Sequence, residues 1–364
     1  MLRAMTPLDA SVIVPSHRGA DRLRTLLPAL AAQDHDGPWE VVVVLDGVVD
    51  DSPAVLESYA VRAPLRVVTL PEQGGVANAL NAGYDAARGR VLIRCDDDLL
   101  PPPHMVRRHV ELHAGRDDLG VIGPTRDRFD DTPYARAYGR PANARLLRTA
   151  YERGPQERWV GWAAHNSLTR ATWERVGGFD PAFTYSEDAE LGARLHEAGI
   201  ELVIDRELEL AHTAPATSLA ERAGRAYVSG SARTVLERTH PRTVTPPPSD
   251  HSAWGRAVAG TARLAGSRKR ATQLGALGDR ALRVLPSGIG GRVAALVVEA
   301  AGRAGHRAGA DNLAEERWTY DRRPVSETTA TGTSTTSAAA TTPQHAKGDD
   351  HGHDRDGRRD PLDP

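Results

Sequence analysis

Short runs of apolar residues alternate with helical patterns along the first half of the chain. Strands that are apolar throughout are buried on both faces of a sheet, and helices between such strands imply that the strands run parallel. The pattern therefore predicts an α/β fold with a mainly parallel sheet flanked by helices. The expected strands are 11–15, 41–45, 65–69 and 91–94, and the expected helices are 22–33 and 76–87.

The texture of the chain changes in its second half. Residues 119–212 are richer in aromatic residues and turns, with an expected strand at 163–169. Four prolines then mark a linker, and an Ala-, Gly- and Arg-rich stretch follows with 13 Lys/Arg against 6 Asp/Glu. The last part has no aromatic residue and too little apolar area to offset its ordering entropy. The expected organisation is a domain at 1–239, a Pro-rich linker at 240–250, a basic helical extension at 251–323 and a disordered tail at 324–364.

Composition narrows the class of protein. A chain of 364 residues with 40% hydrophobic residues can bury a core, and a net charge of -2 gives no overall basic field, so we expect no nucleic-acid partner. The single cysteine, Cys95, allows no internal disulfide or zinc site, which favours a reducing cytoplasm. The N-terminus is typical of a first strand, not of a signal peptide, and no run approaches the roughly 18 apolar residues of a membrane span.

Three adjacent carboxylates, Asp96, Asp97 and Asp98, follow the strand at 91–94. In an open α/β sheet ligands bind at the carboxyl ends of the strands, where these side chains are expected. Adjacent carboxylates repel one another unless a cation is present, and hard oxygen ligands suit Mg²⁺ or Mn²⁺ holding a diphosphate. The alternative is a solvated acidic turn or a helix cap before Pro101.

Two further elements point to the same edge of the sheet. Asp46 ends the second strand and could accept a hydrogen bond from a base or ribose, although an Asp-Gly turn explains it equally well. Gly74 and Gly75 open a helix whose backbone N–H groups could meet an anion, although a plain turn also explains two glycines. The absence of GxGxxG and of a Walker A lysine weakens dinucleotide and P-loop interpretations.

A third acidic pair, Glu187 and Asp188, begins an amphipathic helix. A carboxylate there could act as a general base toward an acceptor hydroxyl, or it could belong to a capping box that starts at Ser186. His212 follows a later strand and would complete a metal site as a partner of the acidic cluster, although a lone histidine is more often a packed or exposed residue.

Aromatic residues near the strand at 163–169 offer a surface for a sugar. Trp159 and Trp162 precede His165 and Asn166, and an indole ring can stack on a sugar face. Core packing of the tryptophans is the alternative. We expect Trp162, Asn166 and Glu187 to contact the acceptor or the sugar.

Five motifs follow one another along the chain: VIVPSHRGADRLRTLLPAL, VVVVLDG, GGVANALNAGYDAARG, VLIRCDDD and GGFDPAFTYSEDAELGARLHEAG. In this order they resemble the motifs of the family 2 glycosyltransferases with a GT-A fold, over about residues 10–212. The resemblance implies a nucleotide-sugar half at about 10–115 and an acceptor half at about 116–239. It also implies an inverting transfer of one sugar from a nucleoside diphosphate sugar, UDP- or GDP-linked, to an acceptor hydroxyl.

The same resemblance implies roles for single residues. Asp46 matches the aspartate that holds the nucleotide base, and Asp96 and Asp98 match the two acids of the DxD motif. Asp188 matches the catalytic base, and His212 matches a less uniform position after the last catalytic strand. Asp98 would hold the metal with Asp96 and His212, while Asp188 would take the acceptor proton.

Nucleotide contacts are also implied for Pro15, Gly75 and Asn81, where the sequence departs from the family pattern. The Tyr-Asn usual after the first proline is Ser16-His17 here, no serine follows Gly47, and Leu80 replaces a common arginine. A QxxRW motif of processive synthases is not evident, so we expect one sugar per encounter.

Two other functions remain open. A sugar-phosphate nucleotidyltransferase also binds nucleotide and metal on an α/β sheet, but its Gly-rich Arg/Lys signature is missing. A non-catalytic scaffold could keep the fold for recognition. The acceptor is unidentified, whether lipid-linked, glycan or small molecule. The basic stretch at 251–323 is either a solvated helical cap or a peripheral contact with the inner face of a membrane.

Overall fold

The structure is a computed structural model that describes residues 7–59, 64–246 and 251–309. All of these residues belong to one compact unit. The predicted tail at 324–364, the end of the predicted helical extension and residues 247–250 of the predicted linker lie outside the described residues.

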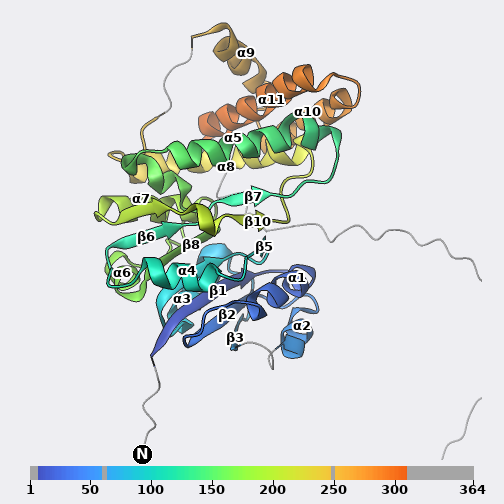
Figure 1. The fold of residues 1–364 in the computed structure, drawn as a ribbon. Helices are drawn as coiled ribbons and strands as arrows, with labels where there is room; N and C mark the ends of the chain where they lie inside the picture. Colours follow the sequence, from blue (N-terminus) through green and yellow to red (C-terminus); the bar gives the residue numbers. More distant parts are fainter. Residues whose placement is uncertain (1–6, 60–63, 247–250, 310–364) are drawn as a thin grey trace, which may run out of the picture. The chain divides into compact units, whose positions relative to one another are not determined.

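A seven-stranded sheet forms the centre of the protein (Figure 1). Its first four strands are parallel, and β8 runs antiparallel to both of its neighbours. The mainly parallel sheet flanked by helices that the apolar runs predict is therefore confirmed. In spatial order the strands are β3 (Leu65–Leu70), β2 (Trp39–Asp46), β1 (Leu8–Ser16), β4 (Gly89–Cys95), β8 (His165–Thr169), β6 (Leu119–Ile122) and β9 (Glu201–Ile204).

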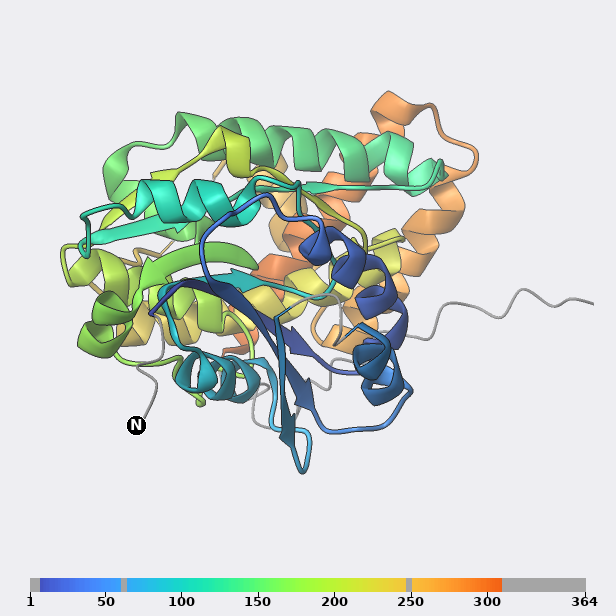
Figure 2. The same ribbon diagram turned by 60° about the horizontal axis from the view of Figure 1, so that its bottom comes forward.

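Each face of the sheet packs against helices, as Figures 1 and 2 show. Side chains alternate between the faces, so Val12 and Val14 of β1 enter one apolar cluster and Ile13 enters the other. Burial on both faces explains why residues 12–14 of β1 and 41–45 of β2 are all apolar. One face is covered by α1 (Ala20–Ala31), α2 (Ser52–Tyr59) and α4 (Met105–Leu112), and the other by α3 (Val76–Ala86), α6 (Arg170–Val176) and α7 (Glu187–Glu197).

A second, three-stranded sheet lies beside the carboxyl end of β4. It consists of β5 (Leu99–Leu100), β10 (Leu210–His212) and β7 (Thr125–Asp127), with β10 in the middle. Its pairing places His212 opposite Leu99 on one side and Asp127 on the other. The strand therefore brings a histidine from late in the chain to the acidic cluster.

Helices from the last third of the chain stack on the side away from β1 to β3 (Figure 1). Glycines allow their backbones to touch, because a Cβ on Gly305 would lie 1.8 Å from the Tyr227 carbonyl oxygen. No helix of the described residues is long and apolar enough to cross a membrane. The remaining helices are η1 (Ala135–Gly139), α5 (Arg140–Glu152), η2 (Pro155–Gly161), η3 (Arg206–Leu208), α8 (Leu219–Thr239), α9 (Ala253–Ala262), α10 (Arg268–Leu282) and α11 (Ser287–Ala308).

Three buried histidines share hydrogen bonds between α4 and β8. His109 Nδ1 lies 2.7 Å from Ser167 Oγ, His113 Nε2 lies 2.8 Å from the same oxygen, and His109 Nε2 lies 2.9 Å from His165 Nε2. Burial lowers the pKa of all three rings, to about 4 for His113 and about 3 for His165. Neutral rings satisfy the three hydrogen bonds, so the folded state holds these histidines uncharged.

We predict that the free energy of unfolding falls as the pH drops below about 6.5. Unfolded histidines bind protons there while the folded rings do not, so each ring removes up to about 1.4 kcal/mol per pH unit. Urea denaturation at pH 7.5, 6.5 and 5.5 measures the slope. His113→Gln, which keeps a donor for Ser167, should reduce the slope, and the exposed control His251→Gln should not. A slope that His113→Gln leaves unchanged contradicts the neutral cluster.

Candidate active site

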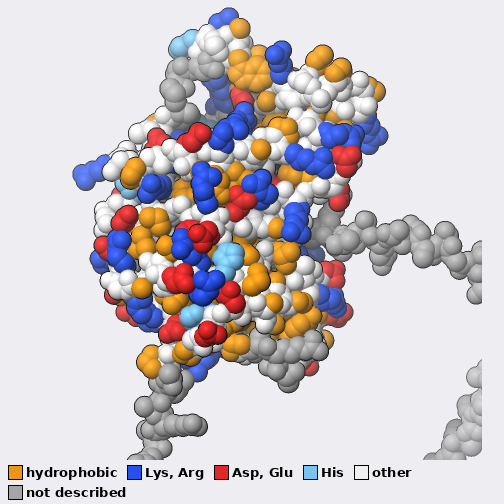
Figure 3. All heavy atoms as spheres, viewed as in Figure 1, with side chains coloured by type: hydrophobic (Ala, Val, Ile, Leu, Met, Phe, Trp, Pro, Cys, Tyr) orange, Lys and Arg blue, Asp and Glu red, His pale blue; other side chains and the backbone are white. Residues whose placement is uncertain are grey.

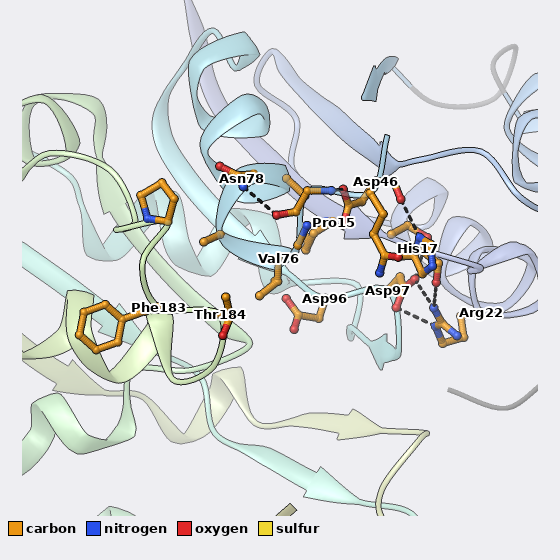
Figure 4. A pocket seen from close by; sticks show the side chains of 17 residues that line it. Pro15, His17, Arg22, Asp46, Val76, Asn78, Asp96, Asp97, Phe183 and Thr184 are labelled. Atoms are coloured by element: carbon orange, nitrogen blue, oxygen red, sulfur yellow. Dashed lines mark hydrogen bonds and ion pairs between the residues drawn. The ribbon is translucent and has the colours of Figure 1, made fainter. Parts of the chain in front are cut away.

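A pocket of about 430 Å³ opens at the carboxyl ends of β1, β2 and β4 (Figure 4). This is the edge at which parallel α/β sheets bind ligands. Residues from five separate stretches of chain meet there. They are Pro15, Ser16, His17 and Arg22, then Asp46, then Gln73 to Ala79, and then Asp96, Asp97, Pro181, Phe183 and Thr184.

Asp46 holds the glycine loop at one side of the pocket. Its two carboxylate oxygens accept hydrogen bonds from the backbone N–H groups of Gly74 at 2.6 Å and Gly75 at 2.9 Å. Gly75 has φ of 89° and ψ of 165°, a conformation that only glycine adopts readily. α3 begins directly afterwards without a side-chain cap, so the N–H groups of its first turn face a pocket suited to an anion.

The carboxylate of Asp97 is neutralised by Arg22 of α1. Arg22 Nε donates to Asp97 Oδ1 at 2.8 Å and Arg22 Nη2 donates to Oδ2 at 2.9 Å, while the hydroxyl of Ser16 donates to Oδ2 at 2.7 Å. Figure 4 shows Arg22 and Asp97 at one end of the pocket, beside His17. Asp97 therefore fixes α1 to the end of β4.

Asp98 is 2% exposed and lies beside His212. His212 Nε2 is 3.2 Å from Asp98 Oδ2, and the opposite ring nitrogen, Nδ1, is 2.7 Å from Asp127 Oδ1. Burial opposes the charged ring, but the hydrogen bonds to Asp127 and Asp98 outweigh it and raise the pKa of His212 to about 9. A carboxylate on the far nitrogen is also how metal-binding histidines are oriented.

Arg94 joins the acidic cluster to the first turn of α7. The side chain is 3% exposed, and its guanidinium makes two hydrogen bonds to Asp96, at 2.8 and 3.1 Å, and one to Glu187 at 3.4 Å. The sequence positions of Arg94 and Glu187 are 93 residues apart. One buried cation therefore couples the strand-end carboxylates to the acidic pair at 187–188.

The acidic pair at the start of α7 is not an ordinary helix cap. Ser186 occupies the cap position with φ of 64°, an uncommon value for a non-glycine residue, and its side chain makes no capping hydrogen bond. Burial raises the pKa of both Glu187 and Asp188, and the proximity of Arg94 opposes the shift. The capping-box alternative is thus wrong, and a carboxyl with a raised pKa is better matched to accepting a proton near neutral pH.

Asn81 is a nucleotide-binding candidate that the structure places elsewhere. Its amide donates to the Phe179 carbonyl at 2.8 Å and its oxygen accepts from the Phe179 N–H at 2.8 Å. Both polar atoms are thereby used to hold the segment before α7 against α3. Within the described residues, the pocket lining includes Asn78 one turn earlier but not Asn81.

Trp162 and Asn166 are also corrected as acceptor-site candidates. Trp162 is 1% exposed within the apolar cluster that α3, α6 and α7 cover, so the core-packing alternative describes it. Asn166 is 0% exposed in β8, opposite Arg94, and its amide donates to the Ala163 carbonyl. Among the described residues, the pocket lining includes neither side chain.

Sequence reasoning missed three residues of this site: Arg22, Arg94 and Asp127. Arg94 carried a signal, because a charged residue in an otherwise apolar strand needs a buried partner. Thr184 also lines the pocket, opposite Asp96 in Figure 4.

Asp98 and His212 fit Mg²⁺ or Mn²⁺ as part of a site whose other ligands come from a bound phosphate and water. Within residues 7–59, 64–246 and 251–309, no three or more His, Cys, Asp or Glu side chains are arranged to hold a metal ion by themselves. Asp98 and His212 nevertheless converge, and such ions commonly use one or two carboxylates together with phosphate oxygens and water. Asp96 has both oxygens on Arg94, so Asp98 is the carboxylate better placed beside the histidine.

A parallel sheet with a pocket and an acidic cluster at its strand ends defines a class of α/β ligand-binding proteins. Within that class, residues 11–174 match the model described as Glycosyl transferase family 2. This match assigns residues 11–174 to glycosyltransferase family 2.

Curated relatives show the same family over part of their length. The chain is 34% identical over 116 residues to the uncharacterized glycosyltransferase YfnE of Bacillus subtilis strain 168, covering 32% of this chain and 30% of that protein. It is 30% identical over 225 residues to the validoxylamine A glucosyltransferase of Streptomyces hygroscopicus subsp. jinggangensis, covering 54% of this chain and 53% of that protein. The chain thus spans between about a third and about half of these relatives.

Solved structures share the fold over most of the chain. A mannosyltransferase from Pyrobaculum calidifontis, solved with GDP-Man and Mn²⁺, superposes with a TM-score of 0.55 at 22% identity and covers 82% of this chain and 87% of its own. Residues 1–349 of TarS from S. aureus give a TM-score of 0.50 at 15% identity and cover 85% and 92%. At these identities the likeness shows the fold alone.

We predict that Arg94→Met destabilises the protein by about 3–5 kcal/mol at pH 7. The substitution leaves the buried Asp96 carboxylate without its cation, and such a group is costly to keep ionised. Urea denaturation measures the change, and Arg88→Met, at an exposed arginine before β4, is the control expected to change stability little. A loss below about 1 kcal/mol would show that the Arg94 network contributes little.

Proposed function

We propose that this chain transfers a single sugar from a nucleoside diphosphate sugar to an acceptor hydroxyl, with inversion at the anomeric carbon. The observation that carries the proposal is the Arg94 network, which joins the acidic end of β4 to the acidic start of α7 beside one pocket. Donor chemistry at residues 10–115 and acceptor chemistry at 116–239 would meet at that junction.

The donor pocket suits a nucleotide with a diphosphate. Asp46 and the loop at Gly75 border one side, and the uncapped start of α3 offers N–H groups and a helix dipole to phosphate oxygens. UDP- and GDP-sugars are the donors we propose. In support, proteins of this fold were solved with GDP-Man and with UDP-GlcNAc.

Asp188 is the group we propose as general base. Its carboxylate takes the proton from the acceptor hydroxyl while that oxygen forms a bond to the anomeric carbon. The bond from the anomeric carbon to the diphosphate oxygen breaks at the same time, and the electron pair leaves with the diphosphate. Burial raises the pKa of Asp188, which strengthens it as a base, while the charge of Arg94 opposes that rise.

The departing diphosphate gains negative charge, and the chain supplies several groups that stabilise it. The first turn of α3 presents backbone N–H groups, and Asp98 and His212 would hold Mg²⁺ or Mn²⁺. When bound, such an ion neutralises charge on the phosphate oxygens. Asp127 keeps the His212 ring oriented, so that Nε2 faces Asp98.

A transferase and its two alternatives give different products. A nucleotidyltransferase releases pyrophosphate from a nucleoside triphosphate and a sugar phosphate, whereas a scaffold binds without turnover. A screen of UDP- and GDP-sugars with Mn²⁺, read as released nucleoside diphosphate, and a parallel assay of nucleoside triphosphates with sugar 1-phosphates, read as released pyrophosphate, separate the three. Release of UDP or GDP supports the proposal, and release of pyrophosphate or binding without turnover contradicts it.

We predict that Asp188→Asn lowers turnover by about 10² or more and leaves donor affinity nearly unchanged. The amide keeps the size of the side chain but cannot accept the acceptor proton. Released nucleoside diphosphate measures turnover, and calorimetry measures donor affinity. Glu174→Gln, on the exposed side of α6, is the control expected to behave as wild type. Normal turnover in Asp188→Asn would remove the base assignment.

We predict that Asp98→Ala abolishes the metal-dependent part of donor binding. Calorimetric titration of UDP and GDP with Mn²⁺ and with EDTA separates that part from the rest. The variant in Mn²⁺ should match the wild-type protein in EDTA, while the exposed control Asp85→Ala retains the full difference. If Mn²⁺ raised the donor affinity of Asp98→Ala as much as it raises that of the wild-type protein, the ion would have to bind away from Asp98.

A further inference from the structure

A groove of about 850 Å³ runs between α5 and α11, on the helical part of the protein. Arg136 and Arg145 line one wall, Arg292 lines the other, and Trp254 of α9 lies at its edge. The floor is closely packed, since a Cβ on Gly291 would lie 2.8 Å from the Ala137 carbonyl oxygen. The groove is therefore formed by helices that touch through their backbones.

The positive charge of this groove has little counter-charge. Within the described residues, neither Arg145 nor Arg292 makes an ion pair, and Arg136 shares Asp131 with a second arginine. Glu299 is the acid among the lining residues, and its carboxylate accepts a hydrogen bond from the Trp254 indole at 2.7 Å. An anionic ligand would supply the negative charge that these arginines lack.

The surrounding helices are as one-sided in charge as the groove. Residues 251–309 contain ten Lys/Arg and two Asp/Glu, an excess of eight positive charges. Both acids are occupied, because Asp279 accepts two backbone N–H groups at the start of α8 and Glu299 holds Trp254. Figure 3 shows Lys and Arg side chains over this helical part, with hydrophobic side chains between them.

Large apolar side chains project from the same helices. Val284, in the turn that joins α10 to α11, is 81% exposed, and Ile289, in the first turn of α11, is 53% exposed. The turn leads directly into the groove, because Ser287 and Gly288 at the start of α11 line it. Apolar groups flanked by arginines suit the boundary between headgroups and acyl chains of a bilayer.

We propose that the groove and the α10–α11 turn bind the surface of an anionic lipid bilayer. A headgroup phosphate occupies the groove between Arg145 and Arg292, and Val284 and Ile289 enter the headgroup boundary. The charge excess supplies attraction at long range, and the apolar turn supplies retention. This contact is independent of the proposed transfer reaction, so its failure would leave that proposal intact.

Co-sedimentation of the full chain with vesicles tests the proposal. Vesicles of phosphatidylcholine alone are compared with vesicles that also contain phosphatidylglycerol. We expect binding to the anionic vesicles that weakens at high salt. Arg145→Gln with Arg292→Gln should weaken it by about 25-fold, taking about fivefold for each arginine. Val284→Gln with Ile289→Gln should also weaken it at unchanged net charge.

A matched control pair separates this site from bulk charge. Arg88→Gln with Arg175→Gln removes two exposed arginines from the sheet domain and should change vesicle binding little. The proposal is overturned if the control pair loses as much vesicle binding as the groove pair. It is also overturned if the groove pair and the Val284/Ile289 pair both bind vesicles like the wild-type protein. Equal binding to neutral and anionic vesicles also overturns it. That result is expected if the groove binds a protein or a nucleic acid instead of a lipid surface. The proposal is also overturned if inorganic phosphate displaces the protein from the vesicles completely and the protein shows no preference for vesicles over free phosphate. The groove would then be a site for a free ion. Unchanged thermal melting of each variant confirms that it is folded.

Discussion

Three consecutive carboxylates buried at the end of β4 are the constraint around which the site is built. Their exposed fractions are 9%, 5% and 2%, so water cannot screen their mutual repulsion. Each is matched with a different basic side chain: Asp96 with Arg94, Asp97 with Arg22, and Asp98 with His212. These three side chains come from different elements, Arg22 from α1, Arg94 from β4 and His212 from β10.

That arrangement links the fold to the proposed chemistry. Arg22 fixes α1 beside the donor pocket, and His212 draws the small sheet against the end of β4. Arg94 reaches the acidic start of α7, so a group proposed for the donor and a group proposed for the acceptor share one cation. Burial raises the pKa of the acids at 187–188, while the arginine opposes that shift. Stability and proton affinity at this junction therefore depend on the same side chain.

Much of the fold could be predicted from the sequence, because strands buried on both faces are apolar at almost every position, as at 11–15 and 41–45. The residues at the ends of these strands could be predicted for the same reason. Asp46 and Asp96, both expected at the carboxyl edge of the sheet, do line one pocket. Trp162 was not, since an aromatic residue beside polar neighbours has the same local pattern whether it lies in the core or at a surface. The pairing of Asp127 with His212 depends on a contact across 85 residues, which no local pattern contains.

We propose that Asp98, three residues after β4, and His212 of β10 hold one cation next to the pocket that Asp96 lines. Anomalous diffraction at the manganese edge, from crystals grown with Mn²⁺ and UDP or GDP, tests it most directly. We expect an anomalous peak between Asp98 and His212, in contact with a diphosphate whose nucleoside lies toward Asp46. A nucleotide bound elsewhere, or a manganese peak remote from Asp98 with the His212 contact unchanged, would contradict it.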